Sequence, residues 1–178
     1  AVPDMYSSIQ KAIGASENLM KIIGSESEKE LLNGKEKPNI TGEISFKNVH
    51  FNYPQRDNID ILKDISFNVD QNQTIALVGP SGSGKSTIGY LLLNYYPILE
   101  GKILFDNIEI SKIDIEHLRS QIAIVPQEVI LFSGSIKENI IYGKLNATDD
   151  EIIEAAKKAN AWEFIVKFPN KLNTEVGD

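Results

Sequence analysis

The chain has 178 residues, 42% of them hydrophobic, enough for a buried core in one domain with an appendage or in part of a larger domain. A net charge of −7 at pH 7 argues against a nucleic-acid partner, which needs clustered lysine and arginine. The sequence has no cysteine, and its longest apolar stretches are too short to cross a bilayer. No signal peptide is recognised, so we expect the chain as given to be soluble.

The first 24 residues predict an amphipathic helix. Apolar side chains recur near i, i+3, i+4 spacing from Met5 to Ile23, and Gly24 provides a C-terminal stop. The apolar stripe needs a cover, which we expect to be the domain body, with a second subunit or an upstream membrane segment as alternatives. Residues 25–42 are rich in Glu, Lys, Ser, Asn, Pro and Gly, which predicts a solvated linker.

Alternating apolar side chains after Glu43 predict antiparallel strands. The phase of the alternation reverses between Phe46 and Val49, which indicates a bulge near Lys47 and Asn48. Further strands are predicted at 65–69, followed by a turn at 70–72, and at 103–105 and 108–110, paired as a hairpin across 106–107.

Two short apolar runs, Thr74–Val78 and Ile122–Val125, predict buried strands, and the second ends at Pro126 and Gln127. Beyond Gln127 the pattern becomes helical. Three helix starts are predicted where a capping side chain precedes an acidic one by three residues: Ser135 with Glu138, Thr148 with Glu151, and Asn160 with Glu163.

A glycine-rich loop lies between the first apolar run and a helical pattern in which Ile88, Leu91, Leu92 and Tyr95 recur. It matches the phosphate-binding pattern G-x-x-x-x-G-K-[ST] without a gap. A Gly/Ser-rich turn with an accidental lysine is the alternative, but the flanking strand and helix favour a phosphate site. The loop consists of Gly79, Pro80, Ser81, Gly82, Ser83, Gly84, Lys85, Ser86 and Thr87.

The pattern also assigns chemistry to the loop. Its backbone N–H groups and the start of the following helix would surround a β-phosphate. Lys85 would reach the β- and γ-phosphates, and the Ser86 hydroxyl would bind Mg²⁺.

From about Glu43 to its last residue, the chain resembles the nucleotide-binding domain of an exporter-type ATP-binding cassette (ABC) transporter. Tyr53 resembles the aromatic residue that stacks on adenine. Gln127 resembles the glutamine that touches Mg²⁺ and the attacking water. Residues 131–143 resemble the segment that faces the transmembrane domain, and the N-terminal helix resembles the connector from the last membrane helix.

This resemblance implies an α/β fold, with a P-loop NTPase core, an antiparallel β subdomain and the start of a helical subdomain. The implied organisation is a connector helix at 1–24, a linker at 25–42 and part of an ATPase domain at 43–178. The implied cofactors are ATP and Mg²⁺, with Ser86 and Gln127 as metal ligands. The implied partners are the transmembrane domain of the same transporter and a second nucleotide-binding domain, packed head-to-tail. The domain would then be membrane-associated, on the cytoplasmic or organelle-matrix side.

The family's signature sequence, its acidic strand with the catalytic glutamate and its switch histidine are expected after Asp178. The signature sequence is only mimicked by residues 131–135, and the acidic strand only by residues 103–106. We interpret Asp106 as a turn residue. The chain therefore resembles the N-terminal part of an ATPase domain in which Gln127 is the remaining catalytic candidate. We expect this chain alone to be inactive in hydrolysis and either to self-associate or to be poorly stable.

Two other functions stay open from the residues. Another P-loop enzyme is one, but a GTPase needs an acid that Asn170–Asn173 lacks, and a small-molecule kinase would not explain Tyr53. The second is a non-catalytic binding or interaction module whose helical segment docks a partner.

Overall fold

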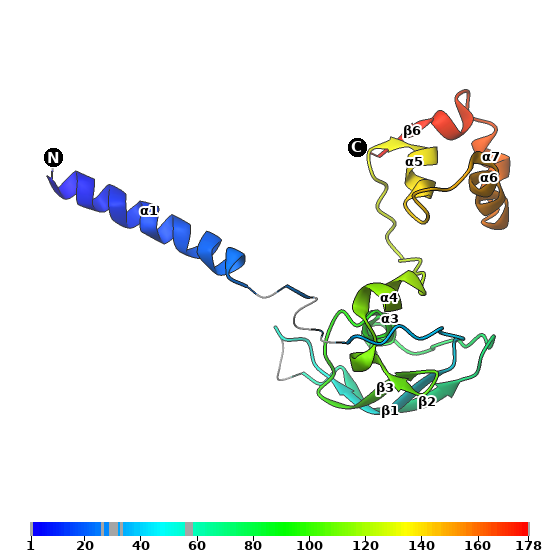
Figure 1. The fold of residues 1–178 in the computed structure, drawn as a ribbon, viewed down its shortest axis with the longest axis horizontal. Coiled ribbons are helices and arrows are strands. Elements are labelled where there is room, and N and C mark those ends of the chain that lie inside the picture. Colours follow the sequence, from blue (N-terminus) through cyan, green and yellow to red (C-terminus); the bar gives the residue numbers. More distant parts are fainter. Residues whose placement is uncertain (1, 26, 29–31, 33, 56–58, 178) are drawn as a thin grey trace. The chain divides into compact units, whose positions relative to one another are not determined.

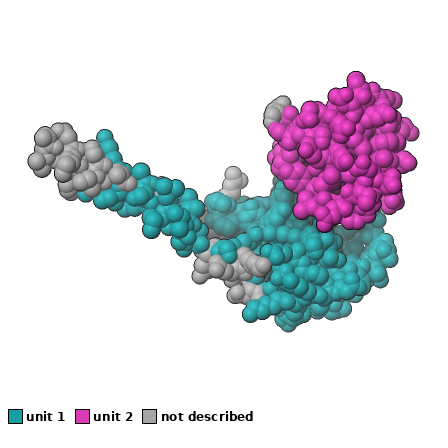
Figure 2. All heavy atoms as spheres, turned by 45° about the horizontal axis from the view of Figure 1, so that its top comes forward, with its two compact units in different colours: residues 1–124 teal, residues 125–178 magenta. Residues whose placement is uncertain are grey.

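The computed structural model describes residues 2–25, 27–28, 32, 34–55 and 59–177 (Figure 1). The chain divides into two compact units, Ala1–Ile124 and Val125–Asp178, coloured separately in Figure 2. None of the helices in these described ranges is long and apolar enough to cross a membrane.

Helix α1 spans Val2–Ile23, as the sequence predicts, and the Gly24 N–H donates to the Met20 carbonyl at its end. The apolar side chains of its last turn are exposed: Leu19 by 60%, Ile22 by 70% and Ile23 by 77%. What covers the apolar stripe stays a prediction.

A four-stranded antiparallel sheet, in the order β2-β1-β3-β4, forms the base of the first unit (Figure 1). Its strands are β1 (Ile44–Phe51), β2 (Leu62–Val69), β3 (Glu100–Phe105) and β4 (Ile108–Glu109). The pairing register shifts between Phe46 and Val49, and Asn48 between them has a φ of +50°. The predicted bulge is thereby confirmed.

The turns also follow the sequence. Asp106 and Asn107 both have positive φ in the hairpin between β3 and β4, a conformation that Asn and Asp tolerate better than most residues. The Asp106 carboxylate accepts from the Thr41 N–H (2.5 Å), the Thr41 hydroxyl (2.6 Å) and the Glu43 N–H (3.0 Å). Asp106 is thus a turn residue that holds the chain entering β1.

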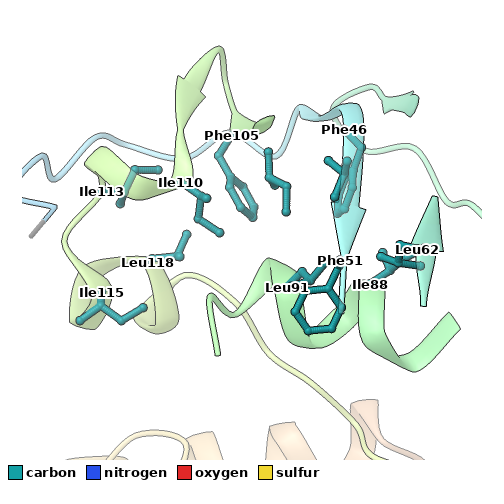
Figure 3. Packing of buried hydrophobic residues seen from close by; sticks show 12 residues of the cluster. Phe46, Phe51, Leu62, Ile88, Leu91, Phe105, Ile110, Ile113, Ile115 and Leu118 are labelled. Atoms are coloured by element: carbon teal, nitrogen blue, oxygen red, sulfur yellow. The ribbon is translucent and has the colours of Figure 1, made fainter. Parts of the chain in front are cut away.

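One apolar core joins the sheet to helix α3 (Lys85–Leu92), the 3₁₀ turn η1 (Ile110–Lys112) and helix α4 (Ile115–Ser120) (Figure 3). Helical spacing brings Ile88 and Leu91 of α3 into this core, and α3 ends before Tyr95. Tyr95 is 47% exposed, so including it in the helical apolar face is wrong. The buried cluster comprises Phe46, Val49, Phe51, Leu62, Ile88, Leu91, Ile103, Phe105, Ile110, Ile113, Ile115 and Leu118.

The two predicted buried strands do not form. Residues 74–78 and 122–125 carry no strand in the described structure, and Val78 and Val125 are 89% and 90% exposed. A strand needs a neighbour that pairs with its backbone N–H and C=O groups, and apolar side chains alone do not provide one. The apolar side chains of these two segments suggested buried strands, but no strand in the described structure pairs with them.

The second unit is mostly helical: β5 (Gly134–Ser135), α5 (Ile136–Ile141), α6 (Asp149–Lys158), α7 (Trp162–Ile165), η2 (Lys171–Asn173) and β6 (Glu175–Val176). The short strands β5 and β6 pair antiparallel. Complete capping boxes at Ser135 with Glu138 and at Thr148 with Glu151 begin α5 and α6, as predicted. The third predicted cap is wrong, because Ala161 rather than Asn160 precedes α7 and no side chain caps it.

Candidate nucleotide-binding site

The phosphate loop leads directly into α3. Gly84, the residue before the helix, has a φ of +83°, and Gly82 has a φ of +79°, a region that glycine adopts without steric cost. A Cβ on Gly84 would also lie 2.6 Å from Leu62 Cδ2, so the loop packs closely against β2. The glycines therefore allow a tight loop whose backbone turns at the positive end of a helix.

Lys85 lies with its ammonium over this loop. Its Nζ donates to the carbonyl oxygens of Gly79 (2.9 Å) and Pro80 (2.7 Å) and lies 3.4 Å from Ser83 Oγ. A lysine held in this way is positioned where negatively charged phosphate oxygens would replace the carbonyl acceptors. The structure thus brings together the residues that the loop pattern predicts.

Tyr53 lies beside the loop's end. Its hydroxyl is 3.0 Å from Thr87 Oγ1, and Thr87 itself is only 5% exposed in the first turn of α3. The Tyr53 ring makes edge contacts with Phe51 (centroids 5.0 Å apart) and with Tyr96 (5.2 Å). The structure therefore joins the predicted base-stacking residue to the predicted phosphate loop.

Tyr96 is the residue of this site that sequence reasoning missed. It follows α3 and packs against Phe51 as well as Tyr53, so it supports the Tyr53 ring from one side. The adjacent pair Tyr95-Tyr96 was a weak signal in the sequence. The helical spacing pointed to Tyr95, which is not the tyrosine that packs at this site.

The described residues contain no group of three or more His, Asp or Glu side chains that could hold a metal ion. Magnesium bound with a nucleotide is commonly held by its phosphates and one or two protein oxygens. The Ser86 hydroxyl is exposed in the first turn of α3, next to Lys85, and is an oxygen ligand of the kind that Mg²⁺ prefers. Ser86 therefore fits the predicted metal site.

Gln127 belongs to the second unit, where its side chain is exposed in a segment without helix or strand. Its amide oxygen has the right chemistry for a hard cation or a water molecule. Its role near the phosphate loop stays a prediction.

The sequence of residues 62–176 matches the family model described as ABC transporter. The chain belongs to the ABC transporter family. The match covers the phosphate loop and the second unit as far as residue 176. The P-loop NTPase fold follows from the family, and the structure adds its helices and antiparallel sheet.

Curated relatives of this ABC chain carry names of ABC transporters, multidrug resistance proteins and permeases. It is 44% identical over 172 residues to ABC transporter B family member 18 of Arabidopsis thaliana, an alignment covering 94% of this chain and 14% of that protein. It is 48% identical over 145 residues to multidrug resistance protein pgp-1 of Caenorhabditis elegans (82% and 11%). It is 39% identical over 176 residues to the ATP-dependent permease MDL1 of Candida albicans (98% and 25%). The chain thus spans a quarter or less of each of these relatives.

Proposed function

We propose that this chain is the ATP-binding part of an ABC exporter, which couples ATP binding and hydrolysis to transport across a membrane. The observation that carries the proposal is the phosphate loop at the start of α3, joined to Tyr53 through Thr87. The loop supplies a site for phosphates, and Tyr53 supplies an aromatic face beside it.

In this proposal, Lys85 exchanges its bonds to the Gly79 and Pro80 carbonyls for bonds to the β- and γ-phosphates. The adenine base stacks on the Tyr53 ring, whose edge contact with Tyr96 fixes its orientation. Ser86 and Gln127 would hold Mg²⁺, which neutralises charge developing on the transferred phosphoryl group. Gln127 would also orient the attacking water.

A transmembrane domain is the proposed partner of the segment 131–143 in the second unit. Phe132 and Tyr142 lie with ring centroids 4.6 Å apart, yet remain 54% and 61% exposed. Asn139 fixes this segment, because its side chain accepts from the Phe132 N–H and donates to the Phe132 and Ser135 carbonyls. A rigid, exposed aromatic pair is typical of a protein interface.

The proposal extends to the assembly. Two such domains would close head-to-tail around ATP, on the cytoplasmic or organelle-matrix side of the membrane. The names of the relatives, which include multidrug resistance and permease proteins, support an exporter.

Phosphate release from Mg-ATP by the full-length protein tests this function. We expect turnover that requires Mg²⁺ and is lost in Lys85→Ala. We expect Gln127→Ala to lower turnover while ATP binding is largely retained. Retained turnover in Lys85→Ala would contradict the proposed site, and ATP binding without turnover would favour a non-catalytic module.

A further inference from the structure

Part of the segment predicted as a linker, residues 35–38, is hydrogen-bonded to the chain that runs from η1 into α4. The N–H groups of Lys35 and Glu36 donate to the Lys112 carbonyl at 2.9 and 3.0 Å, and Asp114 N–H donates to the Glu36 carbonyl at 2.8 Å. His117 Nε2 lies 2.6 Å from the Pro38 carbonyl. The segment therefore follows the chain from η1 into α4.

Gly34 shows how closely this segment approaches. A Cβ built on Gly34 would overlap the carbonyl of Ile113, so no side chain fits at this position without moving backbone. Leu32, two residues earlier, lines a cavity of about 440 Å³ together with Leu91, Ile103 and Ile110 of the core. The segment therefore packs closely against its neighbours at Gly34 and Leu32.

Arg119 of α4 contacts the same segment at Glu28. Its two terminal nitrogens donate to the two carboxylate oxygens of Glu28, at 2.8 and 2.7 Å. This two-point geometry is the strongest form of an arginine–carboxylate pair. The hydrogen bond from Arg119 lowers the pKa of Glu28, and the same bond raises the pKa of Arg119, so the two directions agree.

The same guanidinium also holds the end of the phosphate-binding helix. Arg119 Nε donates to the Leu93 carbonyl at 3.0 Å, and one terminal nitrogen lies 3.4 Å from the Asn94 carbonyl. These are carbonyls just past α3, where a helix lacks internal partners and favours a cation. The Tyr95 ring lies 4.8 Å from the guanidinium carbon and completes the site.

We propose that Arg119 is a positioning residue that couples the segment after α1 to the phosphate-binding helix. One rigid, planar group contacts Glu28 on one side and the carboxyl end of α3 on the other, while Lys85 begins the same helix. A shift of α3 caused by nucleotide is therefore transmitted to Glu28. By linkage, the position of the segment alters nucleotide affinity by the same factor. The inference rests on the proposed ATP site.

The coupling is tested in the full-length protein by two measurements, the affinity for Mg-ATP and the hydrogen exchange of the Leu32, Lys35 and Glu36 amides with and without ATP. Glu28→Gln removes the charge, and Gly34→Ala displaces the segment without changing any charge. Glu154→Gln is the matched control, because Glu154 pairs with Lys158 in the second unit at 2.8 Å.

We expect ATP to change the exchange of these amides in the wild-type protein, and both test variants to diminish that change. We also expect both to weaken ATP binding several-fold, while Glu154→Gln leaves both measurements unaltered. A merely structural ion pair would not alter the ATP-dependent part of the exchange. Undiminished ATP-dependent exchange in Glu28→Gln and Gly34→Ala, with ATP still bound, would overturn the coupling alone. Failure of the wild-type protein to bind ATP would overturn the proposed function and the coupling together.

Discussion

At the scale of single residues, Tyr53 has two separable contacts. Its ring is supported by Phe51 and Tyr96, and its hydroxyl bonds to the buried Thr87. Stacking on a base needs the ring alone, whereas the bond to Thr87 needs the hydroxyl. Affinity and stability should therefore respond differently to substitutions at this position.

We expect Tyr53→Ala to weaken ATP binding by about 1–3 kcal/mol, the usual contribution of stacking on an aromatic side chain. Tyr53→Phe and Tyr53→Trp should bind ATP nearly as the wild type does. Tyr53→Phe should instead lower the free energy of unfolding by about 0.5–1.5 kcal/mol, because the Thr87 hydroxyl loses its partner. Calorimetric titration measures the affinity and urea unfolding measures the stability. If Tyr53→Phe lost as much affinity for ATP as Tyr53→Ala, stacking would be refuted.

Some residues of the site could be predicted from a short stretch of sequence, and others could not. The phosphate loop could be predicted because its glycines, Lys85 and Ser86 act within nine consecutive residues. Tyr96 and Arg119 could not, because their partners, Tyr53 and Glu28, lie 43 and 91 residues away and no local pattern links them. Side-chain pairing over such separations depends on the whole fold.

At the scale of elements, helix starts were the most predictable features. Capping is decided by neighbouring residues, so Ser135 and Thr148 were found from sequence, although Asn160 was not a cap. Strands at 74–78 and 122–125 failed because pairing depends on a partner that local sequence does not specify. The prediction of the β1 bulge was correct because the reversal of the apolar alternation lies within one strand.

Ser135→Ala tests the capping of α5. The Ser135 side chain accepts from the Glu138 N–H and also donates to its carboxylate, so its loss should cost about 1 kcal/mol of unfolding free energy. Trp162, the only tryptophan, lies in the same unit and reports its unfolding by fluorescence. Ser135→Thr, which keeps a hydroxyl, is the control, and equal stability of Ser135→Ala and wild type would contradict the cap.

The same cap predicts a dependence on pH. Hydrogen bonds from the Ser135 backbone N–H and hydroxyl lower the pKa of Glu138 below its ordinary value of 4.5. A lowered carboxyl pKa contributes stability that is fully present above the unfolded value and is lost as the pH falls through the folded value. We expect Glu138→Gln to reduce the acid-induced loss of stability below about pH 4.5, measured by Trp162 fluorescence. An unchanged acid profile would show that the carboxylate is not linked to folding.

At the scale of the whole molecule, apolar side chains are left on the surface of extended segments. Val78 and Val125 are 89% and 90% exposed, and their segments form no strand in the described part of the chain. Such segments can pair with another chain. We expect the 178-residue chain to self-associate at high concentration and Val125→Lys to reduce this, as measured by sedimentation. A wild-type chain that stays monomeric at all concentrations would contradict this expectation.

An equilibrium titration of Mg-ATP measures whether Lys85 and its loop bind the phosphates of ATP. Lys85→Ala removes charge-assisted contacts of about 1.5–3 kcal/mol, so we expect roughly ten- to hundredfold weaker binding by the full-length protein. Lys63→Ala is the control, because Lys63 is an exposed lysine paired with Asp60 at 3.6 Å, outside the loop. We expect wild-type affinity for Lys63→Ala and a large loss of affinity for Lys85→Ala. Identical titrations for Lys85→Ala and the wild type would contradict this expectation.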